Sequence, residues 1–341
     1  MLQKTIVLLL FSCYITSSYA QNPTITIVDT SKKVSIRGLS VVDNNTIWCS
    51  GSNGSVARSI DGGKTFIWQI VAGYEKRDFR DIEAFDANTA IIMGIAEPAI
   101  ILKTKDGGKS WKKVFEDSTK GMFLDAMDFD KKGNGVVVGD PIDNHKYFAT
   151  TKNKGDSWQI VPNINYYKAG EAYFASSGTN LKIINKQFGT PRPNYINEIN
   201  VSGGVESNLS INLHIVKLPI IQGKASTGAN SIDVFKNKAV IVGGDFANDK
   251  DTTLNCVLVD FKGFPQFSHP QTPPHGYRSC VLYINKNTLV TCGTSGVDIS
   301  YDGGSNWQLI STQSFHVVQK AKQGNAIYLA GSRGKIATLI L

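Results

Sequence analysis

The chain has 341 residues and a formal net charge of +8. This length is large for one domain, but barrels and propellers carry such lengths as a single unit. The lysines are scattered, and no cluster of roughly five to eight basic residues predicts binding to nucleic acid. The charge therefore indicates solubility and a mild attraction for acidic partners.

Residues 1–20 predict an export signal. The apolar run Ile6–Phe11 is followed by Ser18 and Ala20, which place small residues at positions −3 and −1 of a cleavage site after Ala20. The run is too short to span a bilayer, and no later stretch approaches the ~20 apolar residues of a membrane helix. We therefore expect an exported protein of the periplasm, the cell surface or the extracellular space. A lipoprotein acylated at Cys13 is the less favoured alternative, because the bulky Phe11 suits that signal poorly.

A short motif occurs four times, with Ser or Thr, then Asp, Gly, a second Ser or Thr and an aromatic residue. The four copies are Ser59–Phe66, Thr104–Trp111, Thr151–Trp158 and Ser300–Trp307, with Asn153 and Asn306 as substitutions. In such an Asp-box the Asp side chain binds amides of its own turn, Gly supplies positive φ, and the aromatic side chain packs between sheets. We therefore expect Trp111, Trp158 and Trp307 to be buried between neighbouring sheets.

The spacing of these boxes predicts the architecture. Three boxes start at residues 59, 104 and 151, and the gap to the fourth, at residue 300, is close to three further periods of about 50 residues. Between the boxes, short apolar runs alternate with turns, and helical periodicity is not sustained. Four short strands per period form one blade of a β-propeller. Seven blades are predicted, starting near Arg37, Arg80, Leu124, Gly170, Asn230, Arg278 and His316.

The last unit, Phe315 to Leu341, has room for only three strands. The isolated strand Thr24–Val28 precedes the first unit, and pairing it into the last blade would close the ring and cover a sheet edge. Residues 189–208 are rich in Gly, Pro and Asn and are expected to form an elaborated loop of the fourth blade. We predict an all-β fold in which residues 21–341 form one seven-bladed propeller domain.

The cysteines and histidines give little support for metal or redox chemistry. Cys49, Cys256, Cys280 and Cys292 follow the predicted signal and form no CxxC pair. Cys280 and Cys292 are expected on two strands of one hairpin, where export would permit a disulfide. Two buried thiols are the favoured interpretation, because such hairpins rarely suit disulfide geometry. The histidines lack metal-ligand spacing, and Asn248–Asp251 lacks the spacing of a calcium loop, so we expect no metal and no cofactor.

Further short motifs are spread along essentially the whole mature chain. They are Arg37–Leu39, Asp78–Asp81, Gly139–Pro141, Gly170–Glu171, Ser177–Asn180, Gly243–Phe246 and Gly276–Ser279. In these motifs the chain resembles the photosystem II stability and assembly factor family of BNR-repeat propellers, especially its exported bacterial relatives. The resemblance implies a scaffold that holds assembly intermediates of a membrane complex. Bacterial relatives are often labelled oxidoreductases, but the sequence has no GxGxxG motif after a strand, no CxxC pair and no haem motif.

Charged residues cluster at the predicted blade starts and after two second strands. The eight candidates for one mouth of the channel are Arg37, Arg80, Asp81, Asp125, Asp140, Glu171, Asp245 and Arg278. Equivalent positions of seven blades form a ring, so these side chains are predicted to converge. Mixed charges in a concavity favour a ligand site. A self-compensated polar channel that only maintains the ring explains the pattern equally well, and both interpretations stay open.

Two functions fit this pattern. The favoured one is a non-catalytic binding or assembly scaffold for an acidic protein, peptide or surface polymer, with arginines gripping carboxylates as bidentate forks. The alternative is a sialidase-like glycoside hydrolase, because Asp-boxes also occur in sialidases. Such an enzyme needs three arginines and a Tyr nucleophile with a Glu partner. The candidates are Arg37, Arg80, Arg278, Tyr173 and Glu171, but Arg37 lacks the Phe-Arg-Ile-Pro context expected of that family.

Overall fold

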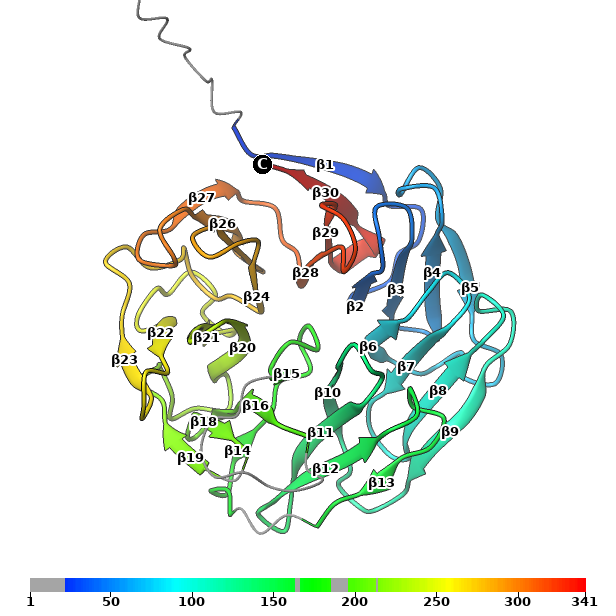
Figure 1. Cartoon of the computed structure of the whole chain (residues 1–341), viewed down its shortest axis with the longest axis horizontal. Coiled ribbons are helices and arrows are strands. Elements are labelled where there is room, and N and C mark those ends of the chain that lie inside the picture. Colours follow the sequence, from blue (N-terminus) through cyan, green and yellow to red (C-terminus); the bar gives the residue numbers. More distant parts are fainter. Residues whose placement is uncertain (1–21, 163–165, 185–195, 213) are drawn as a thin grey trace, which may run out of the picture.

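The strands form seven antiparallel sheets arranged around a central axis (Figure 1). The computed structural model describes residues 22–162, 166–184, 196–212 and 214–341. Each sheet is a blade, and its innermost strand faces the axis, so the predicted seven-bladed all-β propeller is confirmed. The predicted export signal, its cleavage site and Cys13 lie outside the described residues.

Blades 1 to 3 have the same simple order, with four consecutive strands running from the axis outwards. Blade 1 contains β2 (Ile36–Val41), β3 (Ile47–Gly51), β4 (Ser55–Ser59) and β5 (Ile67–Ile70). Blade 2 contains β6 (Phe79–Ala84), β7 (Ala90–Gly94), β8 (Ala99–Thr104) and β9 (Lys112–Asp117). Blade 3 contains β10 (Leu124–Phe129), β11 (Gly135–Ile142), β12 (His145–Thr151) and β13 (Gln159–Ile160).

Blade 5 takes up two short strands from the part of the chain around blade 4. Blade 4 contains β15 (Leu181–Ile183), β16 (Glu198–Val201), β18 (Asn208–Ile211) and β19 (His214–Lys217). Blade 5 contains β20 (Thr227–Phe235), β21 (Lys238–Asp245), β22 (Cys256–Asp260) and β23 (Gln266–Ser268). Two short strands, β14 (Glu171–Ala172) and β17 (Gly203–Gly204), extend the inner edge of blade 5.

The pairing of β14 and β17 with blade 5 overturns two predictions. The fourth blade starts at Leu181 and not near Gly170, because the segment after Gly170 pairs through β17 with blade 5. The stretch predicted to be a loop contains β16 and β17 and the start of β18 among its described residues. Its Gly204 occupies a strand position where another backbone approaches closely, since a Cβ on Gly204 would lie 2.3 Å from the Gly170 carbonyl oxygen.

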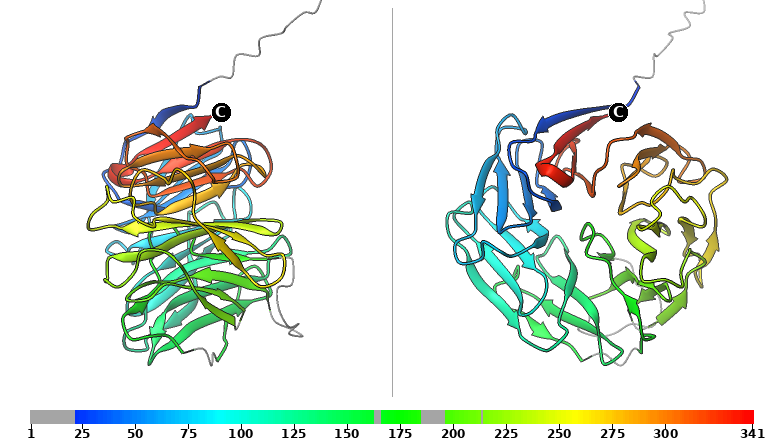
Figure 2. Two further views of the ribbon diagram at one scale, coloured as in Figure 1. Left: turned by 90° about the vertical axis from the view of Figure 1, so that its left-hand side faces the viewer. Right: turned by 180° about the vertical axis from the view of Figure 1, so that it is seen from behind.

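Blades 6 and 7 complete the ring. Blade 6 contains β24 (Cys280–Tyr283), β25 (Leu289–Gly293), β26 (Gly296–Ser300) and β27 (Gln308–Ser311). Blade 7 contains β28 (Val317–Lys320), β29 (Ile327–Ala330), β30 (Ile336–Ile340) and β1 (Thr24–Asp29), with the short helix η1 (Ser332–Gly334) before β30. β1 pairs antiparallel with β30, and both lie together at the rim (Figure 2). The predicted closure by the N-terminal strand is therefore confirmed.

The hydrophobic core is divided among the spaces between neighbouring blades. The largest apolar cluster crosses the closure and joins blades 6, 7 and 1. Lys322 follows β28 and forms hydrogen bonds to two other blades. Its Nζ donates to Ser40 Oγ at 3.0 Å, to Glu83 Oε1 at 2.6 Å and to the Ala84 carbonyl at 2.7 Å. One ammonium group thus connects blades 7, 1 and 2.

The four repeated turns share one hydrogen-bond pattern. In blade 2, Asp106 Oδ1 accepts from the Ser110 amide at 3.0 Å, and Thr104 Oγ1 accepts from the Gly108 amide at 3.0 Å. In blade 3, Asn153 Oδ1 accepts from the Ser157 amide at 3.1 Å. The side chain thus replaces backbone partners that the tight turn cannot supply.

The tryptophans of these turns differ in burial. Trp307 is buried, with 3% of its surface exposed, whereas Trp111 and Trp158 are only half-buried. The prediction that all three are buried is therefore wrong for two of them. Each half-buried ring lies edge-on to one aromatic neighbour, Trp48 for Trp111 and Phe129 for Trp158.

The cysteines of the described residues are all buried free thiols. Cys280 and Cys292 lie directly opposite each other in β24 and β25. The favoured interpretation of two buried thiols agrees with this arrangement.

Candidate functional site

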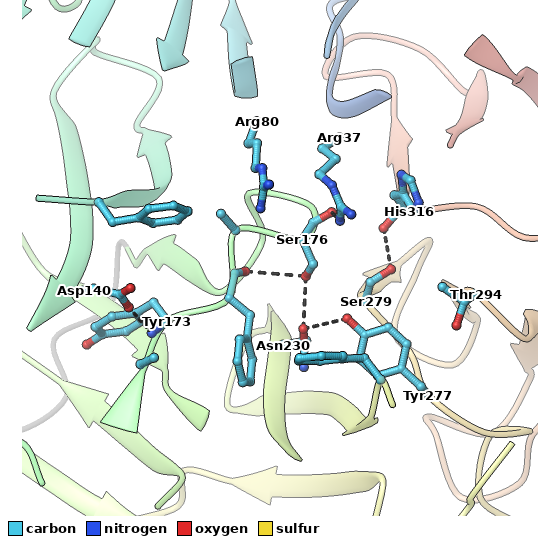
Figure 3. A pocket seen from close by; sticks show the side chains of 15 residues that line it. Arg37, Arg80, Asp140, Tyr173, Ser176, Asn230, Tyr277, Ser279, Thr294 and His316 are labelled. Atoms are coloured by element: carbon cyan, nitrogen blue, oxygen red, sulfur yellow. Dashed lines mark hydrogen bonds between the residues drawn. The ribbon is translucent and has the colours of Figure 1, made fainter. Parts of the chain in front are cut away.

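A cavity of about 500 Å³ lies where the innermost strands begin (Figure 3). Its lining comes from the starts of β2, β6 and β20, from the residues just before β10, β24 and β28, and from the segment that follows β14. Three of the eight predicted site residues, Arg37, Arg80 and Asp140, line it. The structure therefore brings together two arginines and one carboxylate.

β-bulges at the strand starts explain why these side chains converge. The pairing register shifts between Ile36 and Gly38, and again between Phe79 and Asp81. Arg37 and Arg80 are the extra residues at these shifts, and a bulge re-aims the side chain of its extra residue. Asn230 occupies the same position in blade 5 and also lines the cavity.

The two arginines point in the same direction, toward Ser176 (Figure 3). Arg37 donates to the Ser176 carbonyl at 3.1 Å, and it forms no ion pair with any described residue. Burial, followed by the neighbouring Arg80 charge, lowers the pKa of Arg37. Arg80 lies 3.6 Å from Asp78 Oδ2 and 5.9 Å from the centre of the Phe123 ring, and its buried Nε has no acceptor among the described residues. The guanidinium of Arg37 is thus available to an anion.

A single carboxyl group, that of Asp140, lines the cavity away from Arg37 (Figure 3). Asp140 Oδ1 accepts from the Tyr173 amide at 2.8 Å, and burial raises the pKa of Asp140 to about 6. Asp125, the extra residue of the β10 bulge, is fully buried and does not line the cavity. Burial and the charge of Asp140 raise the pKa of Asp125, while the charge of Arg80 opposes that shift. The cavity therefore has a cationic side and an acidic side.

Aromatic rings form a third side. Phe174 and Phe246 meet edge-to-face at 5.8 Å between centroids, and Phe246 meets Tyr277 at 6.2 Å. The Tyr277 hydroxyl donates to Asn230 Oδ1 at 2.8 Å, and Ser176 Oγ donates to the same oxygen at 3.1 Å. These bonds fix the wall, while Phe246 remains 49% exposed.

His316 lies beside Arg37 on the cationic side (Figure 3). Its Nδ1 is 2.8 Å from the Ile36 carbonyl oxygen. Burial, followed by the charge of Arg37, lowers the pKa of His316 to about 4. The imidazole is therefore neutral near pH 7, and the positive charge of the cavity comes from the arginines.

Arg278 does not line the cavity, contrary to the prediction. It is fully buried within blade 6, where Nε donates to Asp298 Oδ2 at 2.7 Å and NH1 donates to Ser295 Oγ at 2.6 Å. The cavity is lined instead by Ser279, the next residue along the chain. Adjacent residues of an extended chain point to opposite sides, so a register error of one residue exchanges a buried side chain for a channel side chain.

The remaining predicted residues also point elsewhere. Asp81 bridges two blades, because its Oδ2 accepts from the Met127 amide at 2.8 Å. Glu171 accepts from Asn208 Nδ2 at 2.9 Å and also from the Ser202 hydroxyl. Asp245 accepts from the Ala247 amide at 2.9 Å and lies 3.8 Å from Lys224 Nζ. Asp81, Glu171 and Asp245 therefore stabilise strand ends and do not line the cavity.

The prediction missed the aromatic and neutral residues of the site. Phe123 and Tyr277 each precede an innermost strand, and Phe246 follows Asp245 directly. These aromatic residues stand beside charged positions that were predicted to line the channel. Their place in the sequence could therefore have identified them as lining residues. Phe174 and Ser176 had no comparable signal, because they lie between β14, which joins the sheet of blade 5, and β15, the first strand of blade 4.

The described residues contain no group of three or more His, Cys, Asp or Glu side chains that could hold a metal ion. Within the same residues, no helix has the length and apolar character needed to cross a membrane.

Comparisons of sequence identify neither a matching family model nor a matching curated protein. Solved structures do match. YCF48 bound to D1 peptide is 16% identical, with a TM-score of 0.63 over 94% of this chain and 97% of that one. YCF48 from Cyanidioschyzon merolae is 14% identical, with a TM-score of 0.60 over 92% and 98%. The WD40 β-propeller domain of Doa1 is 14% identical, with a TM-score of 0.61 over 92% and 95%. The chain thus shares the propeller fold of YCF48 and of the WD40 domain of Doa1.

Proposed function

We propose that this protein is an exported, non-catalytic binding scaffold that recognises an acidic protein, peptide or surface polymer at the mouth of its channel. The observation that carries the proposal is the pair of arginines from two blades that face one cavity, of which Arg37 has no ion-pair partner among the described residues. A guanidinium offers a planar fork of donors that fits a carboxylate or a phosphate.

Two further observations support a macromolecular ligand. One structure with this fold is that of YCF48 bound to D1 peptide, so the fold is compatible with peptide binding. The half-exposed Phe246 extends the site with apolar surface at its rim. Exposed aromatic side chains beside arginine are typical of protein-binding sites. Export is proposed from residues 1–20 of the sequence.

A sialidase-like reaction is not favoured by the geometry. Arg278 is buried against Asp298 and does not join Arg37 and Arg80 at the cavity. The Tyr173 hydroxyl donates to Asn200 Oδ1 at 2.8 Å, and burial raises the pKa of that hydroxyl well above its ordinary value. Such a tyrosine is poorly prepared to act as a nucleophile. We therefore propose a role without catalysis.

The proposal is tested with the double variant Arg37→Gln/Arg80→Gln and a fluorescent acidic peptide followed by anisotropy. Binding should be lost in this variant and kept in Arg333→Gln, which removes an exposed arginine outside the cavity. Equal affinity of both variants would contradict the site. Turnover of a fluorogenic sialoside by the unaltered protein would contradict the non-catalytic assignment.

A further inference from the structure

The charged side chains of the lining favour the binding of one anionic group and disfavour a second one. Arg80 already faces an acid, because Asp78 Oδ2 lies 3.6 Å from its guanidinium. Arg37 is the other cation of the lining, and among the described residues its one hydrogen-bond acceptor is the Ser176 carbonyl. Asp140 also lines the cavity, away from Arg37 (Figure 3). A ligand with several carboxylates would therefore bring at least one of them toward Asp140.

The lining also contains aromatic side chains, which a site for an anion alone would not need. Phe174, Phe246 and Tyr277 form a continuous edge-to-face row, and Phe123 lies under Arg80. A ligand in contact with this row gains affinity by removing apolar surface from water. A volume of about 500 Å³ lies within the range of small-ligand sites and exceeds the space that one carboxylate occupies.

We propose that the cavity selects a single carboxylate placed next to an apolar or aromatic side chain, and that it discriminates against polyacidic segments. This inference rests on the proposed function and narrows its ligand class. Arg37 holds the carboxylate, Phe174 and Phe246 contact the neighbouring side chain, and Asp140 repels further negative charge. The carboxylate can belong to the end of a peptide chain or to a Glu or Asp side chain, since the guanidinium fork fits both.

Capped small compounds separate these contributions. N-acetylphenylalanine carries one carboxylate and one ring, N-acetylglycine lacks the ring, and N-acetylphenylalaninamide lacks the charge. Acetylated tetraglutamate amide supplies charge without apolar surface. Acetyl-Glu-Phe-amide places its only carboxylate on a side chain. Dissociation constants are measured by calorimetry on the mature protein.

N-acetylphenylalanine or acetyl-Glu-Phe-amide should bind at least about tenfold more tightly than N-acetylglycine, because burying one aromatic side chain has an effect of that order. The tighter of these two compounds identifies the source of the carboxylate. N-acetylphenylalaninamide should bind at least about tenfold more weakly than the tighter of these two compounds, and tetraglutamate should bind no more tightly than N-acetylglycine.

Two variants locate the effect. Phe246→Ala should reduce the affinity for the tighter aromatic compound toward that for N-acetylglycine and leave the affinity for N-acetylglycine unchanged. Its matched control is Phe264→Ala, which removes an exposed phenylalanine, 70% accessible, that does not line this cavity. Arg37→Gln should abolish binding of every carboxylate, and Arg37→Lys should restore it only in part because lysine lacks the planar fork.

Tightest binding by tetraglutamate, or affinities of both N-acetylphenylalanine and acetyl-Glu-Phe-amide no higher than that of N-acetylglycine, would overturn this inference and leave the proposed function standing. Absence of binding by all the carboxylates, tetraglutamate included, would overturn both.

Discussion

Arg278 Nε donates to Asp298 Oδ2 at 2.7 Å, and both side chains are fully buried inside blade 6. Breaking a buried ion pair by removing one member typically costs about 3–5 kcal/mol. We therefore expect Arg278→Ala to lower the free energy of unfolding by that amount, measured by urea denaturation. Arg333→Ala, which removes an exposed arginine, should change it little. A stable Arg278→Ala protein would contradict a structural role for this pair.

The burial of each tryptophan should determine how much its truncation destabilises the fold. Trp307 is buried, whereas Trp111 is half-buried and packs edge-on to Trp48 at 6.4 Å between centroids. Truncation of a buried tryptophan to Ala costs about 3–5 kcal/mol. We expect Trp307→Ala to fall in this range and Trp111→Ala to be milder, compared by thermal unfolding. The reverse order would show that the turn of blade 2 contributes more to stability than its burial indicates.

The repeated turns should weaken in acid. The bonds from Ser110 and Thr104 lower the pKa of Asp106 to about 2, below its ordinary value of 3.8. A depressed carboxylate pKa contributes stability above the unfolded-state pKa, and this contribution is lost as the pH falls through the folded-state pKa. Stability should therefore decline between about pH 4 and pH 2. Asp106→Asn should decline less over this window, because Asn153 accepts the equivalent bond in blade 3 without titrating.

Ligand affinity should follow the charge of Asp140. Its pKa is raised to about 6 by burial, so its negative charge is lost between pH 7.5 and pH 5. An acidic ligand at Arg37 should therefore bind more tightly at pH 5 than at pH 7.5. His316, with a pKa lowered to about 4, stays neutral over this range. In Asp140→Asn the affinity should be nearly independent of pH in calorimetry, and an unchanged pH profile would assign the effect to another group.

We expect Lys322 to stabilise the closed ring. It joins three blades through Ser40, Glu83 and the Ala84 carbonyl. Lys322→Met keeps the length of the side chain but leaves these acceptors unpaired, which should cost about 1–3 kcal/mol. Lys64→Met, at an exposed position of the first repeated turn, is the matched control. Equal unfolding midpoints of the two variants in urea would contradict a role for Lys322 in closure.

The sequence by itself determined the architecture. The repeated turns specify their own hydrogen bonds locally, as Asp106 and Ser110 illustrate, and their regular period fixes the size of a blade. The short last unit and the isolated strand Thr24–Val28 also determined the closure, because an unpaired edge strand needs a partner.

Only the tertiary structure decided which side chains meet. Arg37 and Arg80 reach the cavity because bulges re-aim them, whereas Arg278 lies one residue from the channel position and turns into the blade. Strand side chains alternate with a period of two, so a shift of one residue reverses their direction, and alignment of blade starts cannot resolve such a shift. Phe174 and Ser176 reach the site because β14 and β17 join blade 5, which is a pairing between distant segments that no local pattern encodes.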